Sequence, residues 1–340
     1  MRSLRFVLLF ATIAISVASP AQQYKVTNSI SSAGEGGWDY SFADSIARKL
    51  YVTHGSEVLV IDLDSEKSVG KITGLNRIHG VAIADDLHRG FISDGAANEV
   101  VVFDTSTNSE IQKVKAGTNP DGIVFDPFSK RVFAFNGRSQ DATVIDAATG
   151  KVAGTIGLGG KPEFPVSDGK GNLYVNIEDK SEIARINPAS MQVEARWPLA
   201  PCEEPSGLAM DTANRRLFAV CSNQKMAVVN ADTGKVVATV GIGNGPDATS
   251  FDAGKGLVFS SNGQDGTITV VKQESPDKYS VLETVPTEKS ARTMTLDSKT
   301  HRLFLSAAKL GPPPAATAAN PHPWPKVVPD SFHVLVVSPL

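Results

Sequence analysis

The sequence has no excess of basic residues: 33 Lys and Arg stand against 36 Asp and Glu, a formal net charge of −3. Proteins that bind nucleic acid through its phosphates are usually basic, so this balance argues against nucleic acid as a partner. Only two of the 340 residues are cysteines, too few for a disulfide-rich scaffold or for four cysteine ligands at one zinc ion. Motifs for covalent haem (C-x-x-C-H), for a serine hydrolase (G-x-S-x-G) and for a glycine-rich phosphate loop are also missing.

Long apolar runs are missing too, except at the very start of the chain. Residues 1–5 form a short basic head, residues 6–17 are mostly apolar, and residues 18–21 are small. This order is typical of a secretory signal peptide, with Gln22 as the first mature residue. The alternative, a membrane anchor, is disfavoured because the apolar run is shorter than the roughly 20 residues that span a bilayer. We therefore predict a signal peptide over residues 1–21 and a soluble periplasmic or secreted chain without a membrane span.

What the sequence does contain is a repeat rich in Val, Ile and Gly. The segments EVLVID, EVVVFD, DATVID, EIARIN, MAVVNA and TITVVK follow one another at steps of 41 to 43 residues. Two strand-like segments precede each of them, as in HGVAIA and RGFISD, and a turn with a further strand follows, as in TGKVAGTI. A period near 42 residues that holds four short strands predicts the blade of a β-propeller.

The number of first strands predicts seven blades. The seventh begins at Arg292, and its third strand, residues 332–338, ends the chain without a fourth. Residues 24–30 (YKVTNSI) have the character of an isolated fourth strand, so we expect the two terminal strands to pair and close the ring. The prediction is an all-β, seven-bladed propeller with four-stranded antiparallel blades, forming one domain over residues 22–340. Residues 310–331 are rich in proline and predict an excursion loop within blade 7.

The segments KLYVTHGS and RLFAVCSN resemble the YVTN repeat, and the blade pattern is similar to that of YncE-like seven-bladed propeller proteins. The resemblance covers nearly all of the chain after residue 23. It implies an exported propeller with a binding or scaffold role. It also implies that surface layers, cofactors or DNA are possible partners, of which DNA conflicts with the charge balance.

The first strand of a blade lines the central channel, so the residue that opens it should lie at one mouth of that channel. We call these residues the inner ring: Asp39, His79, Asp121, Glu163, Ser206, Asp247 and Arg292. The ends of the second strands form an outer ring on the same face: His54, Asp94, Asn136, Glu178, Cys221 and Asn262. The inner ring predicts an acidic channel mouth that binds a cation, a basic peptide or a sugar. The alternative is that its aspartates only stabilise turns, with their charges facing channel water.

A divalent cation is a possible cofactor, and no other cofactor is expected. His54 and His79 fall in adjacent blades on the predicted face, where Asp94 and Asp121 complete a set of four candidate ligands. A dedicated metal site needs three or four ligands in a fixed geometry. Ordinary polar channel histidines are the alternative.

The two cysteines belong to the same predicted blade. Cys202 lies in the connection that enters blade 5, and Cys221 ends the second strand of that blade. In an exported protein such a pair favours a disulfide bond. A catalytic Cys221 is the less favoured alternative.

These observations favour a monomeric binding or interaction protein that recognises a protein, a peptide or a small molecule at the channel mouth. An enzyme at the same mouth stays open as the alternative, either a metal-dependent hydrolase of the lactonase type or an oxidoreductase. In that case Asp121, Asn136, Glu163 and Glu178 would supply the metal ligands.

Overall fold

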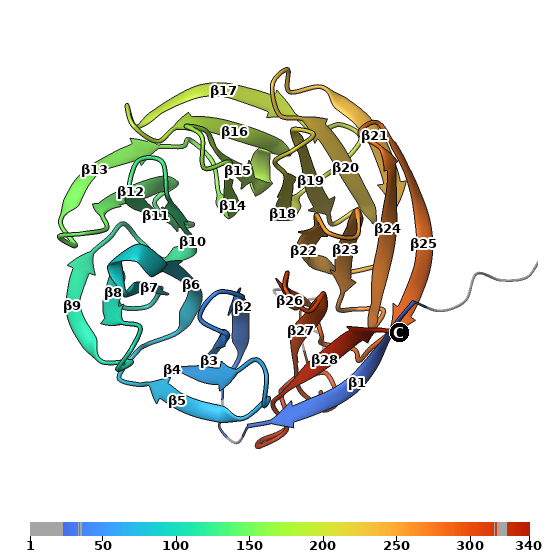
Figure 1. The fold of residues 1–340 in the computed structure, drawn as a ribbon, viewed down its shortest axis with the longest axis horizontal. Coiled ribbons are helices and arrows are strands. Elements are labelled where there is room, and N and C mark those ends of the chain that lie inside the picture. The colour runs from blue at the N-terminus through green and yellow to red at the C-terminus, as the bar shows by residue number, and fades with distance from the viewer. Residues whose placement is uncertain (1–22, 33, 35, 316, 318–324) are drawn as a thin grey trace, which may run out of the picture.

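A computed structural model describes residues 23–32, 34, 36–315, 317 and 325–340 of the chain (Figure 1). Seven four-stranded antiparallel sheets surround a central channel, which confirms the predicted propeller. The predicted signal peptide, residues 1–21, lies outside the described residues. Within the described residues, no helix has the length and apolar character needed to cross a membrane.

Blades 1 to 4 each use four consecutive strands, with the first strand innermost and the fourth at the rim. Blade 1 contains β2 (Trp38–Asp44), β3 (Lys49–His54), β4 (Glu57–Asp62) and β5 (Ser68–Ile72), and blade 2 contains β6 (Ile78–Ala84), β7 (Arg89–Asp94), β8 (Glu99–Asp104) and β9 (Glu110–Lys115). Blade 3 contains β10 (Pro120–Asp126), β11 (Arg131–Asn136), β12 (Asp141–Asp146) and β13 (Val152–Gly157), and blade 4 contains β14 (Pro162–Ser167), β15 (Leu173–Ile177), β16 (Glu182–Asn187) and β17 (Gln192–Pro198). Two short 3₁₀ helices, η1 (Asp85–Leu87) and η2 (Glu178–Lys180), follow β6 and β15.

Blades 5 and 6 repeat this order, and blade 7 combines both ends of the chain. Blade 5 contains β18 (Pro205–Asp211), β19 (Arg216–Cys221), β20 (Lys225–Asn230) and β21 (Val236–Gly241), and blade 6 contains β22 (Pro246–Asp252), β23 (Leu257–Asn262), β24 (Thr267–Ser275) and β25 (Lys278–Pro286). Blade 7 contains β26 (Thr293–Asp297), β27 (Arg302–Ala307), β28 (His333–Pro339) and β1 (Tyr24–Ser31).

The N-terminal strand closes the ring as predicted. β1 runs antiparallel to β28, with Tyr24 opposite Pro339 and Ser31 opposite His333. The ring of Tyr24 is buried and packs edge-on against Phe259 of blade 6, with centroids 5.1 Å apart. The first strand of the chain is therefore the outer strand of its last blade.

The hydrophobic core is divided among the contacts between blades. Seven buried clusters are found in the described residues, one for each pair of neighbouring blades. Between blades 3 and 4, for example, Phe133 and Phe135 of β11 pack with Leu173 and Val175 of β15. Stability therefore comes from neighbouring blades, as in other repeat architectures, and closure of the ring buries both faces of every sheet.

The predicted disulfide is present in blade 5. It joins Cys202, before β18, to Cys221 at the end of β19, with the two Cα atoms 5.6 Å apart. Both cysteines are fully buried in the cluster between blades 4 and 5. Cross-linking a loop of this length stabilises a fold by roughly 3 kcal/mol in the chain-entropy model. The thiolate that a catalytic Cys221 would need is absent from this structure.

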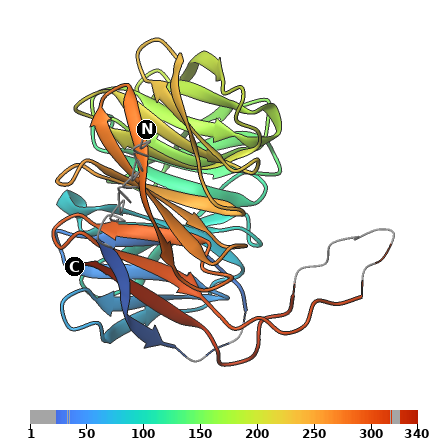
Figure 2. The same ribbon diagram turned by 90° about the vertical axis from the view of Figure 1, so that its right-hand side faces the viewer.

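The described parts of the proline-rich insertion, residues 310–315, 317 and 325–331, extend away from the disc between β27 and β28 (Figure 2). A short antiparallel ladder holds its base, where Leu310 bridges to Val327 and the Gly311 N–H donates to the Lys326 carbonyl at 2.8 Å. This ladder lies just before the proline run, so backbone pairing stops where the prolines remove the N–H donors.

Candidate functional site

All seven inner-ring residues line one cavity of about 300 Å³ at a mouth of the channel. Six of them are the second residue of a first strand, and Arg292 directly precedes β26. Tyr40, Arg77, Lys161 and Glu178 complete the wall. The propeller thus gathers side chains that lie far apart in the sequence.

A β-bulge recurs at the position of the inner ring. In blade 1, Trp38 pairs with His54 and Ser41 pairs with Val52, so two residues of β2 stand opposite one residue of β3. The same irregularity occurs between the first two strands of blades 2 to 6. A bulge interrupts the alternation of side chains along a strand. Consecutive residues of blade 1 therefore both reach the cavity, which the sequence pattern did not predict for Tyr40.

A polar residue on the second strand braces this bulge against the next blade. The Ser93 hydroxyl donates to the Asp121 carbonyl at 2.6 Å and accepts from the Gly80 N–H at 2.8 Å. Asn176 donates to the Ser206 carbonyl at 2.9 Å in the same way. The repeat pattern did not predict these braces, although a polar residue inside an apolar strand is a visible signal. The equivalent positions hold Thr53, Ser93, Asn176 and Ser261.

His79 lies between two carboxylates from neighbouring blades. Its Nδ1 atom is 2.7 Å from Asp39 Oδ2 and 3.6 Å from Asp121 Oδ1. Burial alone would lower the pKa of His79, but the hydrogen bond with Asp39 and the charge of Asp121 raise it. The ligand atoms of these three residues lie within 4.8 Å of one another, and they are the one set in the described part of the chain that is close enough to share a metal ion.

Glu163 stands in a second group on the same wall. Lys161 Nζ lies 2.7 Å from Glu163 Oε1, and the Tyr40 hydroxyl donates to Glu163 Oε2 at 3.2 Å. Burial, and then the charge of Asp121, raises the pKa of Glu163 to about 8, which Lys161 offsets only in part. Burial, and then the charge of Asp39, raises the pKa of Asp121 to about 7. The cavity therefore holds more carboxylate charge than its own cations neutralise.

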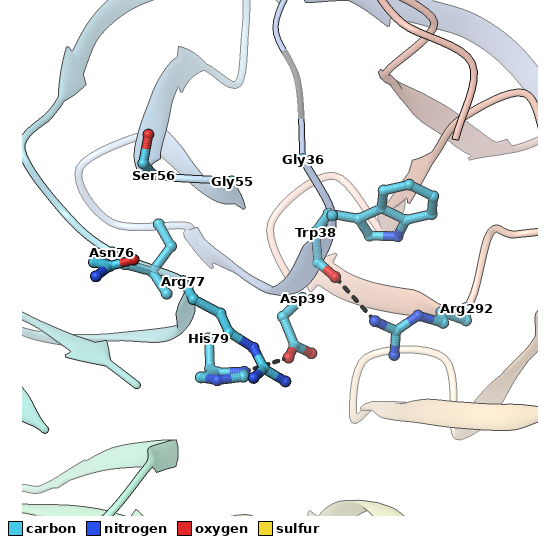
Figure 3. A pocket seen from close by; sticks show the side chains of 11 residues that line it. Gly36, Trp38, Asp39, Gly55, Ser56, Asn76, Arg77, His79 and Arg292 are labelled. Atoms are coloured by element: carbon cyan, nitrogen blue, oxygen red, sulfur yellow. Dashed lines mark hydrogen bonds and ion pairs between the residues drawn. The ribbon is translucent and has the colours of Figure 1, made fainter. Parts of the chain in front are cut away.

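Arg292 closes the site across the junction of blades 6, 7 and 1. Its guanidinium pairs with the Asp247 carboxylate and donates from Nη2 to the Trp38 carbonyl at 2.9 Å. In Figure 3, Asp39 lies between Arg292 and His79. Burial raises the pKa of Asp247, although Arg292 opposes the shift.

The channel mouth carries more positive charge than the inner-ring residues alone supply. Arg77 and Lys161 come from the connections just before β6 and β14, and both face the cavity. With them the cavity wall carries five carboxyl groups and three permanent cations. The mouth remains acidic on balance, but by less than the inner ring alone predicts.

A wider hollow of about 650 Å³ adjoins the cavity over blades 1, 2 and 7 (Figure 3). It shares Asp39, Arg77, His79 and Arg292 with the inner cavity. Its outer wall includes Gly36, Gly37, Gly55 and Ser56, whose small side chains leave the entrance broad. A ligand at the inner ring can therefore extend onto the surface of blade 1.

The outer ring has a different environment from the inner ring. His54 is buried and stacks on Phe332, with ring centroids 3.9 Å apart, and burial lowers its pKa. The Asp94 carboxylate accepts backbone N–H groups from Asn76 and Ala97 at 3.0 and 3.3 Å. The contacts of these two side chains are with the surrounding protein, and the predicted group of four metal ligands is not formed. Asp39 takes their place beside the two remaining candidates.

The other outer-ring residues also point into the blades, with one exception. Asn136 and Asn262 are fully buried, and each donates to a threonine on the adjacent strand at 3.0 Å. Cys221 is held in the disulfide. Only Glu178 lines the cavity, and it lies in η2 directly after β15 rather than in the strand itself.

No protein-family model matches this sequence, and no curated protein matches it either. Solved structures do match the fold. The structure of U3-55K has a TM-score of 0.76 and 8% identity over 95% of this chain and 100% of its own. The RRP9 WD40 repeats have the same score and identity over 94% of this chain and 99% of theirs.

At this identity the likeness shows the fold alone. The chain has the seven-bladed β-propeller fold, which it shares with these WD40-repeat structures. The narrower assignment to YVTN-repeat, YncE-like proteins is not confirmed by these comparisons.

Proposed function

We propose that this protein is an exported, YncE-like binding protein whose channel mouth recognises a cationic group on a small ligand. The observation that carries the proposal is the convergence of Asp121 and Glu163 in one small cavity. The raised pKa values of both carboxyl groups, about 7 and about 8, reflect burial and neighbouring acidic charge, which the surrounding cations offset only in part. A bound cation stabilises the ionised forms, so binding and loss of protons are coupled.

The surroundings of the mouth support binding rather than bond chemistry. The Ser206 hydroxyl donates to the Pro246 carbonyl at 3.2 Å instead of meeting a general base. The inner ring sits on a scaffold braced by hydrogen bonds between blades, such as that from Ser93 to Asp121. A rigid preformed cavity binds with little loss of conformational entropy. The signal-peptide pattern of residues 1–21 supports export.

Calorimetric titration of the mature chain with butylammonium near neutral pH tests this proposal. We expect saturable binding that weakens at least about tenfold when Asp121→Asn and Glu163→Gln are combined, because both changes remove the negative charge. Glu110→Gln is the matched control, since Glu110 is exposed on β9 at the rim. Wild-type binding should also release protons, measured by repeating the titration in buffers with different ionisation enthalpies. Equal binding by the wild type and the double variant contradicts the proposal.

A second candidate function rests on the group formed by Asp39, His79 and Asp121. One imidazole and two carboxylates suit a divalent ion, which a hydrolase of the lactonase type or an oxidoreductase would use. Metal analysis of untagged protein by mass spectrometry separates the two functions. About one equivalent of a divalent ion, lost in Asp121→Asn, supports the enzyme. Metal-free protein that is equally stable in a chelator contradicts it.

A further inference from the structure

A separate cavity of about 290 Å³ lies further along the same first strands. Its wall comes from β2, β6, β10 and β14 of blades 1 to 4. In each strand the lining changes from charged to mostly apolar within a few residues of the inner ring, as from Asp121 to Ile123 and from Glu163 to Phe164. We call this cavity the apolar chamber.

Tyr40 forms a common wall between the apolar chamber and the channel mouth. Its hydroxyl donates to Glu163 on the mouth side at 3.2 Å. Its ring packs edge-on against Phe164 of the chamber, with centroids 5.0 Å apart. One side chain therefore marks the boundary between a carboxylate-rich space and an apolar one.

The apolar chamber is suited to receive an apolar group. An apolar wall that faces open space gains packing contacts when an apolar molecule fills that space. Its wall also carries the Ser41 hydroxyl, which is buried and has no hydrogen-bond partner among the described residues. The volumes of the two cavities together fall within the roughly 300–1,000 Å³ typical of small-ligand sites. They are too small for a folded partner.

We propose that the ligand is a single amphipathic cation, with an ammonium head among the carboxylates of the mouth and an apolar tail in the apolar chamber. The head follows from charge complementarity with Asp121 and Glu163, so this part rests on the proposed function. The tail follows from the position of the apolar chamber directly beside the mouth, since the two cavities share Tyr40 and are lined by neighbouring residues of the same strands.

A series of n-alkylammonium ions from ethyl to octyl tests the inference by calorimetry on the mature chain. We expect the affinity to rise about two- to fourfold for each methylene that enters the chamber and then to level off. The n-alkyl sulfates of equal length are the charge-reversed control and should not show this series. An affinity for ethylammonium that does not increase with chain length overturns the inference and leaves the proposed function intact. If no ammonium ion binds, both the proposed function and this inference are wrong. If the affinity of the sulfates rises equally with chain length, the tail binds independently of an ammonium head, and the inference of a single amphipathic cation is wrong.

A change within the chamber wall locates the tail. Ser41→Leu places an apolar side chain in the chamber, so the gain from butyl to octyl should disappear while ethylammonium binding stays unchanged. Ser41→Ala, which leaves the chamber open, should keep the full gain. An undiminished gain in the leucine variant places the tail elsewhere and overturns the inference. The wild-type series decides the question by itself if the leucine variant fails to fold.

Discussion

Acidic residues stand at both ends of the innermost strands, and the two sets behave in opposite ways. At the channel mouth, burial raises the pKa of Asp121 and Asp247. At the opposite end, Asp211 and Asp297 are buried too, but hydrogen bonds outweigh burial and lower their pKa values. The same residue type, at opposite ends of equivalent first strands, thus has its ionised form disfavoured at the mouth and favoured at the other end.

The difference lies in what the next blade supplies. Arg48 of blade 1 contacts Asp297 of blade 7 at 2.8 Å, and Arg215 of blade 5 contacts Asp168 of blade 4 at 2.7 Å. At the mouth, Arg292 of blade 7 pairs with Asp247, but Asp121 has no such partner of its own. The charges of Asp39 and Asp247 act against its ionised form, and only the shared His79 and the more distant charge of Lys161 favour it. A buried carboxylate with a fixed cationic partner holds blades together, whereas one without such a partner is available for a ligand.

Blade 2 departs from this pattern at the end opposite the mouth. Its first strand ends in Ala84, and the following Asp85 faces Asp44 of blade 1. Burial, and then the charge of Asp44, raises the pKa of Asp85 to about 6. The link to blade 3 is instead the pair of Asp86 with Lys130 at 2.7 Å, which is half exposed. The position within a blade alone therefore does not determine whether an aspartate is stabilised.

The largest expected effect is on stability, from Arg48→Ala. This change leaves the Asp297 carboxylate fully buried without its partner, and it should lower the free energy of unfolding by about 3–5 kcal/mol. Urea unfolding at neutral pH measures the loss, with exposed Arg138→Ala as the matched control.

The effect of Arg48→Ala also has a pH dependence of known sign. Because the pKa of Asp297 is lowered in the fold, its contribution is present above the unfolded pKa of about 4 and is lost as the pH falls further. The difference between variant and wild type should therefore shrink in acid. A difference that stays constant down to acid pH would mean that Arg48 acts through packing alone.

A smaller effect of opposite sign is expected at the mouth. Asp121→Asn combined with Glu163→Gln should raise the free energy of unfolding by about 1–3 kcal/mol at slightly alkaline pH, since the fold disfavours both charged forms. Folded pKa values raised to about 7 and 8 make wild-type stability fall as the pH rises from about 4 to 8. Thermal or urea unfolding across this range should give a flatter profile for the double variant. If the double variant is less stable than the wild type at alkaline pH, the ionised carboxyl groups at the mouth do not destabilise the fold.

The smallest effect is expected from Lys130→Ala in blade 2. The ion pair with Asp86 is solvent-exposed, so its loss should cost at most about 1 kcal/mol. High salt should remove even that difference, which urea unfolding with and without salt can measure. A loss of stability as large as that of Arg48→Ala would show that burial does not explain the difference between the two inter-blade ion pairs.

The repeat was sufficient to predict the architecture, because each strand occupies the same place in a period of about 42 residues. It also predicted the inner ring, since the position that opens a first strand faces the channel in every blade. It could not predict Lys161, because the side chain of a connecting residue has no direction set by the period. Tyr40 was missed because a bulge brings it into the cavity.

The sequence pattern also could not predict the contacts of the outer-ring residues. His54 stacks on Phe332, which is far away in the sequence and directly precedes β28. The hydrogen-bond partners of Asp94 are backbone N–H groups that any residue could supply. Long-range packing and backbone contacts leave no residue pattern, so the same polar types look alike at a binding site and inside a blade.

The pairing of β1 with β28 has a consequence for the synthesis of the chain. Tyr24–Ser31 is synthesised long before its partner His333–Pro339, with all the other strands of the ring between them. Until then blade 7 lacks both of its outer strands, and the rim of β27 stays open. Closure of the ring therefore has to wait for β28, and a product that stops before β28 leaves β1 with an open edge that can pair with other chains.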